Sequence, residues 1–444
     1  MKTDRRSALA GLAGSLTCLA TGGCSELMAS ETAPTFIRRE GIRLMSGDMP
    51  YRIAGANMWY AAWLGADAEY GNRARLGREL DRLKQLGLNN VRIMAAAEEG
   101  PLKNSISPGF SKAGGSLNPE LLSGLDYAIA EIAKRGMTAV VCLGNFWEWS
   151  GGFGTWLYRV TGQYMDMNDP AHPWPAYPDA TAAFYGNAEA VALYREYVRA
   201  IVARTNSLTG QAYADDPAIM SWQLANEPRP GGTNAGVARY HDAYVQWIDD
   251  SVELIRSLDA HHLVSLGHEG TQGAHGSEDI VRRAHATVDY LTAHIWPLNW
   301  GWVDGKDLTG TWEAGSEKIR DYLSTHERLA TELGKPLVFE EFGFPRDGEV
   351  YSPGTPSTFR ELYYRTIYNA VELSRRSNGP VMGSNFWAWN GEARTAHADA
   401  RFRPGDLAYM GDPPHEPQGW YGVFDNDEAM LAVIGDHANA LAVK

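Results

Sequence analysis

The sequence predicts an α/β fold, a (β/α)8 or TIM barrel with long loops on its C-terminal face. Eight short apolar runs rich in β-forming residues alternate with amphipathic stretches of helical period, and the alternation continues to the C-terminus. Strands that alternate with helices form parallel sheets, and eight such units favour closure into a barrel. A doubly wound open sheet is the alternative architecture. The eight runs cover residues 52–59, 90–94, 138–143, 219–225, 263–267, 290–296, 337–342 and 381–389.

The segments between the runs carry the end signals of helices. Asn118 and Pro119 supply an N-cap and a first-turn proline, an apolar stripe of leucine and isoleucine follows, and Gly136 ends the helix. Similar stripes predict helices at residues 75–86, 188–204, 237–258, 317–333, 357–376 and 427–443, with a shorter one at 277–286.

Three connections are much longer than those that usually join strand and helix. They cover residues 144–186, 297–316 and 390–427, and each follows a strand candidate. In a barrel such loops lie on the C-terminal face, where active sites are built. Because no linker, repeat or low-complexity tract interrupts the chain, we expect one catalytic domain over residues 36–444.

Composition narrows the classes of ligand. The formal net charge is −14 and there is no long basic run, which argues against nucleic acid or an anionic membrane surface as partner. A neutral ligand suits this charge, and the 15 tryptophans favour one with flat apolar faces, such as a sugar. Nothing in the sequence implies a protein partner.

The N-terminus has the order of a secretory signal. Lys2, Arg5 and Arg6 precede an apolar stretch of small residues over 8–23, so we assign residues 1–30 to a signal peptide. The two arginines leave twin-arginine export open beside the general secretory route. We expect an exported protein, located in the periplasm, on the outer membrane or outside the cell.

The cysteines give information on attachment of the protein to a membrane, and they do not predict stabilising disulfides. Cys24 ends a Thr-Gly-Gly-Cys string that is similar to a lipoprotein cleavage box, so a lipid anchor at Cys24 and an ordinary cleaved signal are both open. Cys142 lies in an apolar run and is expected to be buried and unpaired. The chain offers neither a disulfide framework nor a zinc-binding spacing.

Two carboxyl groups stand at the ends of predicted strands. Glu227 follows the fourth run after Asn226, and Glu341 lies at the end of the seventh. A retaining glycosidase needs two such groups about 5 to 5.5 Å apart, one to protonate the leaving oxygen and one to attack the anomeric carbon. A single glutamate near a strand end is more often a solvated or capping residue, but strand ends that meet at one barrel mouth can supply the pair.

Several strings at these strand ends resemble glycoside hydrolase family 5. They are LANEP at 224–228, VFEEFGF at 338–344, GSNFWAW at 383–389, NNVRIM at 89–94 and LTAHIWP at 291–297. GNFWEWSGG at 144–152 and the stretch 405–424 are similar to the mannanase branch of that family, which includes endo-β-1,4-mannanases and exo-acting β-mannosidases. The resemblance runs from Phe36 to the C-terminus.

The resemblance implies roles for five polar residues. Glu227 matches the acid/base, Glu341 the nucleophile, and Asn226 the neighbour that hydrogen-bonds the sugar 2-hydroxyl. Arg92 matches the arginine against the nucleophile, where its charge favours an ionised carboxylate, although a structural ion pair in the barrel would place it there as well. His294 matches a histidine that lines the cleavage site.

Adjacent residues of a strand point to opposite faces. We therefore expect Glu340 to point away from the barrel mouth, toward the helix layer.

Aromatic residues are the other candidates for substrate binding. Trp387 matches the platform beneath the sugar at the cleavage site. Trp296 stands where much of the family has a tyrosine whose hydroxyl reaches the nucleophile, so its indole N–H either replaces that donor or the ring stacks on sugar. Trp59 and Trp147 lie at or just past strand ends, where we expect them to line a carbohydrate cleft. Taken singly, each tryptophan is more often packing than ligand platform.

The function expected from the sequence is retaining hydrolysis of β-1,4-mannosidic bonds without metal or cofactor. Endo-cleavage is favoured, and the alternatives are exo-cleavage, which the 144–186 loop would enforce by closing one end of the cleft, then attack on β-1,4-glucan. A non-catalytic carbohydrate-binding barrel would lack a paired carboxyl or Arg92. A metal-dependent hydrolase would need clustered ligands at several strand ends, and the sequence does not provide them.

Overall fold

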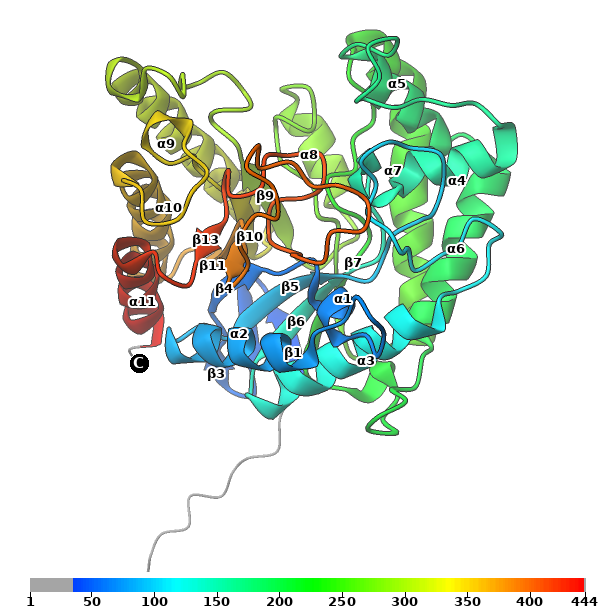
Figure 1. Cartoon of the computed structure of the whole chain (residues 1–444), viewed down its shortest axis with the longest axis horizontal. Helices are drawn as coiled ribbons and strands as arrows, with labels where there is room; N and C mark the ends of the chain where they lie inside the picture. Colours follow the sequence, from blue (N-terminus) through cyan, green and yellow to red (C-terminus); the bar gives the residue numbers. More distant parts are fainter. Residues whose placement is uncertain (1–34, 443–444) are drawn as a thin grey trace, which may run out of the picture. The chain divides into compact units, whose positions relative to one another are not determined.

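A computed structural model describes residues 35–442, and eight parallel strands form its centre. The strands are β4 (Ile53–Asn57), β5 (Asn90–Met94), β6 (Thr138–Cys142), β7 (Ile219–Gln223), β8 (Leu263–Ser265), β9 (Leu291–Ile295), β10 (Leu337–Phe342) and β11 (Val381–Phe386). Their order is β8-β7-β6-β5-β4-β11-β10-β9, and a parallel bridge between Ser265 and Tyr290 joins the two ends. The predicted TIM barrel is therefore confirmed (Figure 1).

The strands form where residues can be buried on both sides. Every residue of β4, β5 and β7 is buried, as expected for parallel strands with a packed interior on one face and helices on the other. Gly383 allows β11 to lie close to β4, because a Cβ at this position would come within 2.1 Å of the Ile53 carbonyl oxygen.

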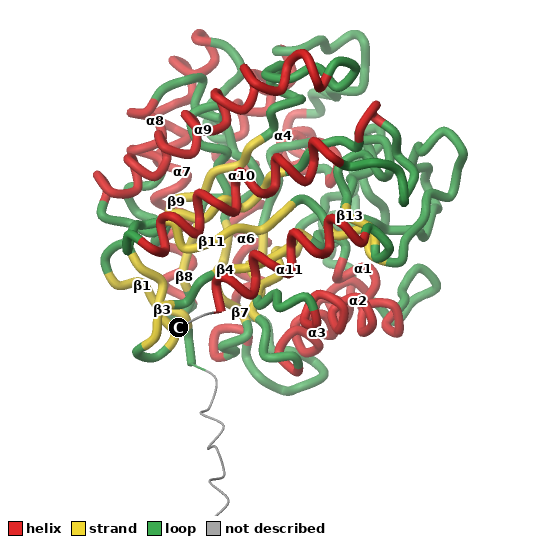
Figure 2. Tube along the Cα trace, turned by 90° about the vertical axis from the view of Figure 1, so that its left-hand side faces the viewer, coloured by secondary structure: helices red, strands yellow, loops and turns green. Residues whose placement is uncertain are grey.

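Eight helices follow the strands and surround the barrel (Figure 2). They are α2 (Arg73–Gln85), α3 (Pro119–Lys134), α6 (Ala188–Val202), α7 (Asn234–Leu258), α8 (Glu278–Ala284), α9 (Leu308–Leu333), α10 (Thr358–Arg376) and α11 (Glu428–Ala442). All eight predicted helices are present. The main difference is α9, which begins inside the expected 297–316 loop because the Asp307 side chain caps it by accepting a hydrogen bond from the Gly310 amide.

A small antiparallel sheet of β1 (Ile37–Glu40), β2 (Arg43–Ser46) and β3 (Met49–Pro50) precedes the barrel. Its Ile37 and Leu44 belong to one apolar cluster with Ile53 and Leu263, which are the first residues of β4 and β8. The N-terminal end of the barrel is thus closed by apolar packing, and Glu340 and Glu341 lie in the second half of β10, toward the opposite end.

The 144–186 loop contains η1 (Glu148–Ser150), α4 (Gly152–Thr161), α5 (Ala176–Thr181) and η2 (Ala182–Phe184). Between β11 and α11, β12 (Trp389–Gly391) pairs in parallel with β13 (Val423–Phe424). The remaining short elements are α1 (Ala61–Gly65), η3 (Tyr213–Asp215) and η4 (Asp347–Glu349). The sequence did not predict any of these elements.

The proposed signal peptide and Cys24 lie outside the described residues, so their assignments stay predictions. Cys142 is buried and free, as expected. Within residues 35–442, no helix combines the length and the apolar character that crossing a membrane requires.

Candidate active site

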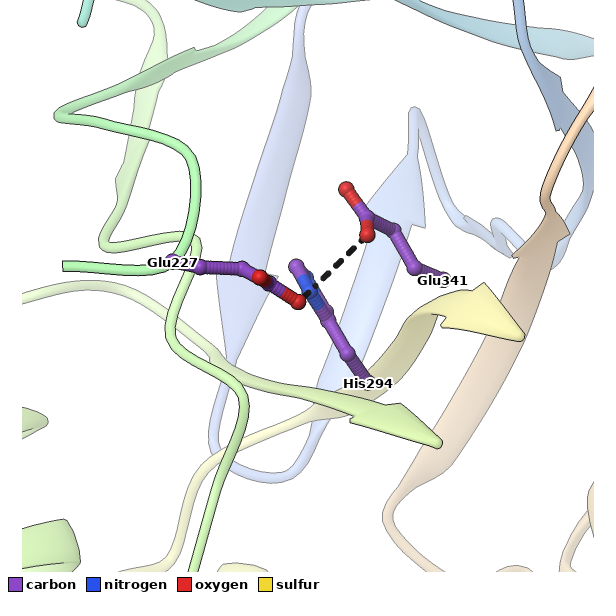
Figure 3. Close-up of side chains that lie close together, drawn as sticks. All are labelled: Glu227, His294 and Glu341. Carbon is purple, nitrogen blue, oxygen red and sulfur yellow. Dashed lines mark hydrogen bonds and ion pairs between the residues drawn. The ribbon is translucent and has the colours of Figure 1, made fainter. Parts of the chain in front are cut away.

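Glu227 and Glu341 meet at the C-terminal end of the barrel (Figure 3). Glu341 lies in β10, and Glu227 follows β7 with a left-handed backbone, φ +50°. One oxygen of each carboxylate and one ring nitrogen of His294 all lie within 4.8 Å of one another. Both side chains are buried, with Glu227 7% and Glu341 2% exposed. Two buried carboxylate groups therefore face each other within 4.8 Å at the mouth of the barrel.

His294 of β9 lies between the two carboxylates. Its Nδ1 is 2.7 Å from Glu227 Oε1 and 3.2 Å from Glu341 Oε2. The ring is fully buried. This single imidazole nitrogen therefore fixes both carboxylates relative to each other.

Arg92 of β5 connects Glu341 to three amide side chains. Its guanidinium forms an ion pair with Glu341 and donates hydrogen bonds to Gln223 Oε1 at 2.7 Å, Asn57 Oδ1 at 2.9 Å and Asn226 Oδ1 at 2.8 Å. Arg92 is 3% exposed. The fixed fork of the guanidinium thereby positions residues from the ends of three strands, β4, β7 and β10.

Two indole groups donate to Glu227 in addition to His294. Trp147 Nε1 lies 2.6 Å from Glu227 Oε2, and Trp296 Nε1 lies 3.2 Å from Oε1. Trp296 is therefore a donor, but its N–H reaches Glu227 and not Glu341. Each oxygen of Glu227 accepts at least one N–H hydrogen bond.

The contacts of His294 set the protonation of the pair. Burial would raise the pKa of Glu227, but the hydrogen bond and charge of His294, with Arg229, outweigh it and lower this pKa. Burial opposes protonation of His294, yet Glu341 and the hydrogen bond to Glu227 raise its pKa well above the usual value. One proton is therefore held on the hydrogen bond between Glu227 and His294, and it titrates as a property of the pair.

Glu340 does not point toward the helix layer, so that expectation is wrong. Its Oε2 accepts a 2.6 Å hydrogen bond from Gln223 and lies 4.0 Å from His294 Nε2, and its Oε1 accepts from Tyr290 at 3.2 Å. Val338, two residues earlier, packs in the apolar cluster at the base of the barrel, so alternation directs Glu340 inward. The register of β10 against β9 shifts between Phe339 and Glu341, and this irregularity allows the next carboxylate to reach the mouth as well.

A cavity of about 750 Å³ opens beside Glu227. Predicted residues in its wall are Asn226, Glu227, Trp147, Trp296 and Trp387. The wall also contains Trp149, Met167 and Trp174 from the 144–186 loop, Asn299 and Trp300 from the loop after β9, and Pro413, His415 and Glu416 from the loop before α11. The long loops therefore form the sides of the cavity.

Four predicted residues lie outside this wall. Arg92, His294 and Glu341 form the buried layer behind it. Trp59 is 3% exposed, packs against Trp149 and donates its indole N–H to the Gly411 carbonyl at 2.9 Å. Trp59 therefore supports the loop that forms one wall and does not line the cavity.

Sequence reasoning assigned no role to several polar residues of the site. Asn57 and Gln223 are the last residues of their strands and hold Arg92 by hydrogen bonds. Their position, a polar side chain at the end of a buried strand, is the sequence feature that could have identified them. Arg229 forms a two-point ion pair with the buried Glu269, whose pKa burial raises to about 7 although Arg229 opposes the shift. No sequence motif connected these two residues.

The cluster of Glu227, His294 and Glu341 is compact enough to hold a cation. However, N–H groups of Arg92, Trp147 and Trp296 already point at the carboxylate oxygens. A cation would have to displace these donors, which cannot act as ligands. The donor set fits a pair of reacting carboxylates better than a metal centre.

A (β/α)8 barrel with two facing carboxylates, an arginine beside one of them and an aromatic cavity defines a glycoside hydrolase. A family sequence model described as "GH family 5 beta-mannosidase-like" matches residues 34–444. The chain belongs to glycoside hydrolase family 5.

Known proteins agree with this assignment. The chain is 33% identical to a family 5 mannosidase from Rhizomucor miehei, with a TM-score of 0.82 over 92% of this chain and 97% of that one. It is 29% identical to a putative mannan endo-1,4-beta-mannosidase 9 of Oryza sativa subsp. japonica, covering 79% of this chain and 81% of the relative. An endo-1,4-beta-mannanase from R. miehei shares the fold, with a TM-score of 0.66 at 22% identity over 92% of this chain and all of that one.

Proposed function

We propose that this enzyme hydrolyses β-1,4-mannosidic bonds in mannan or manno-oligosaccharides with retention of anomeric configuration. The observation that carries the proposal is the approach of Glu227 and Glu341 to within 4.8 Å on either side of His294. Retaining enzymes hold their carboxyl groups about 5 to 5.5 Å apart, whereas inverting enzymes need about 6.5 to 9.5 Å to admit a water molecule.

In the first step Glu341 attacks the anomeric carbon as the bond to the leaving oxygen breaks. Glu227 donates a proton to that oxygen, so the leaving sugar departs with a neutral hydroxyl and a covalent glycosyl-enzyme forms. In the second step Glu227 takes a proton from water, the water oxygen bonds to the anomeric carbon, and Glu341 is released as carboxylate. The product keeps its β configuration.

His294 supports both steps through its shared proton. The 2.7 Å hydrogen bond allows this proton to pass to Glu227 as the leaving oxygen gains charge, and to return afterwards. Arg92 stays paired with Glu341 and fixes the position of its carboxylate. Arg92 and His294 therefore act as positioning residues.

Mannose-based substrates are supported by the relatives and by the cavity. The names of the matched proteins are those of mannosidases and mannanases. Trp296 and Trp387 contribute to the wall, and their rings meet edge to face with centroids 6.1 Å apart. Flat indole faces suit the apolar C–H face of a pyranose, and a neutral sugar suits a protein of net charge −14.

Endo-cleavage, which the sequence favours, is supported by the plant relatives named mannan endo-1,4-beta-mannosidase. Exo-cleavage is the second candidate. It is favoured by the match to the R. miehei mannosidase, which exceeds that to the R. miehei mannanase in both identity and TM-score. The long loops that wall the cavity are the elements that would exclude internal chain segments.

Two measurements test this function. Proton NMR of the first product formed from mannotetraose should show the β-anomer, and initial release of the α-anomer would refute retention. Chromatography of early products from mannohexaose separates the two modes, since mixtures of mannobiose and mannotriose indicate endo-cleavage and mannose alone indicates exo-cleavage. Activity confined to cellohexaose would refute the mannose assignment.

We also propose export through the signal over residues 1–30, with lipidation or plain cleavage as the two outcomes. The basis is the charged and apolar pattern of the N-terminus. Fractionation and N-terminal mass analysis of the wild type and of Cys24→Ser would test this, because only a lipoprotein loses its membrane association in the variant.

A further inference from the structure

An exposed tryptophan stands at the rim of the cavity, and the chemistry above does not use it. Trp174 lies in the loop before α5 and is 56% exposed. Among the large apolar side chains that are exposed within residues 35–442, it is the one aromatic residue. Its ring nevertheless lines the same cavity as Glu227. Exposure of so large an apolar surface at a ligand cavity points to binding.

Trp174 is held in place by two neighbours. Its ring stacks on Trp147, with centroids 6.2 Å apart and planes at 26°, and the Arg229 guanidinium lies 5.7 Å from the Trp174 ring and 5.0 Å from that of Trp147. Arg229 is in turn fixed by its ion pair with Glu269. On the far side, Trp147 stacks on the buried Tyr177 at 6.1 Å. The exposed ring is thus the outer member of an ordered stack.

The stack lies on the side of Glu227 that is turned away from the nucleophile. Trp147 donates to Glu227 Oε2, whereas His294, which also contacts Glu341, bonds Oε1. An acid/base carboxyl stands beside the leaving group, on the side away from the nucleophile. The order Glu341, Glu227, Trp147, Trp174 therefore runs from the reacting sugar toward the leaving group.

We propose that Trp174 is the platform of a second subsite on the leaving-group side, where it binds the pyranose ring of the second sugar unit beyond the cleaved bond. Trp147 contacts the first unit, next to the acid/base. The proposal rests on the proposed function, because it uses Glu227 as acid/base to define the leaving-group side. Trp174 would then determine which chain lengths are good substrates, without any part in bond cleavage.

The experiment compares substrates that reach Trp174 with one that does not. Wild type and Trp174→Ala are assayed on mannotriose, mannotetraose and 4-nitrophenyl β-mannoside. We expect kcat/KM on the two oligosaccharides to fall about tenfold, mainly through KM, which corresponds to about 1.4 kcal/mol. The nitrophenyl mannoside, whose leaving group ends at Trp147, should change less than about twofold. Trp174→Phe should recover most of the loss.

The matched control is Leu208→Ala, since Leu208 is 51% exposed and does not line the cavity. It should leave all three substrates unchanged. Equal effects of Trp174→Ala on every substrate, or none on any, would overturn the subsite while leaving the proposed hydrolysis intact.

Binding tests the subsite without turnover. Titration of mannotetraose into Glu341→Gln and into the double variant Glu341→Gln, Trp174→Ala should give dissociation constants that differ about tenfold. Equal constants contradict the subsite, even if the wild type hydrolyses mannosides. A wild type without activity, combined with a tenfold difference in binding, would instead refute only the proposed reaction.

Discussion

Glu340 and Glu341 are neighbours in β10, yet both carboxylates enter one buried hydrogen-bond network. Glu341 pairs with Arg92, Arg92 bonds Gln223, and the amide of Gln223 donates to Glu340. The His294 ring lies between the two acids, with Nδ1 toward Glu341 and Nε2 toward Glu340. The two carboxylates therefore share partners, although we propose the role of nucleophile for Glu341 alone.

This relationship predicts unequal effects of one conservative change. Glu341→Gln removes the nucleophile and should lower kcat by more than about 10⁴-fold. Glu340→Gln keeps the shape of the side chain and disturbs its contacts with Gln223, Tyr290 and His294, so we expect a loss on the order of tenfold. Steady-state kinetics on mannotetraose measures both. A larger loss for Glu340→Gln would mean that the two roles are exchanged.

The error over Glu340 shows where a sequence pattern stops being informative. Period-two alternation places one of two adjacent side chains inward, but it does not say which, and a register shift near Phe339 brings both inward. The strands were predictable because burial on both faces requires continuous apolar runs. Trp59 failed as a cleft residue for a related reason, since a position after a strand does not reveal whether the loop above covers the ring.

Other parts of the site depend on contacts that no local pattern carries. Arg229 and Glu269 pair across two strand ends, and Trp174 stacks on Trp147 from a loop whose helices the sequence did not predict. Glu227, Glu341 and Arg92 could be predicted from the sequence because polar residues at the ends of buried strands converge at one barrel mouth.

A second prediction concerns the dependence on the leaving group. Glu227→Ala removes the proposed proton donor, so hydrolysis of mannotetraose should fall by roughly 10³-fold or more. 2,4-Dinitrophenyl β-mannoside needs no protonation to leave, and its glycosyl-enzyme should form at nearly the wild-type rate. A pre-steady-state burst of dinitrophenol would show this. Equal losses on both substrates would indicate that Glu227 is not the acid.

Azide provides the control for that variant. It needs no general base and should attack the accumulated glycosyl-enzyme, restoring turnover and yielding a β-mannosyl azide. An α-azide would mean that Glu341 does not form the covalent bond.

A third prediction concerns pH. The proton shared by Glu227 and His294 is held tightly because Glu341 and the hydrogen bonds to its neighbours raise the pKa of His294. In His294→Gln only Glu227 can carry this proton, so it should be lost at lower pH. We expect the basic limb of the kcat/KM profile on mannotetraose to move toward acid by about one unit or more, with the acid limb less affected. An unmoved basic limb would assign that limb to another group.

The last prediction concerns stability and the 144–186 loop. Glu98 is 1% exposed, one of its oxygens accepts the Gly152 amide, and the other has no partner among the described residues. Burial raises its pKa to about 7, and it does the same for Glu148, which accepts from Asn168. Both acids belong to the packing around α4, whose N-terminal residue is Gly152.

Because these pKa values are higher in the folded than in the unfolded protein, the folded state binds protons more tightly. Their contribution to stability is therefore fully present below about pH 4.5 and is lost as pH rises toward 7. Glu98→Gln keeps an oxygen acceptor but cannot ionise, so it should raise the free energy of unfolding by about 1 to 3 kcal/mol at pH 8 and leave it nearly unchanged at pH 4. Urea unfolding at both pH values measures the difference. Glu196→Gln, at an exposed position, is the control and should leave the free energy of unfolding unchanged at both pH values. If Glu98→Gln changes this free energy equally at the two pH values, ionisation of the buried carboxyl does not govern the stability of the loop.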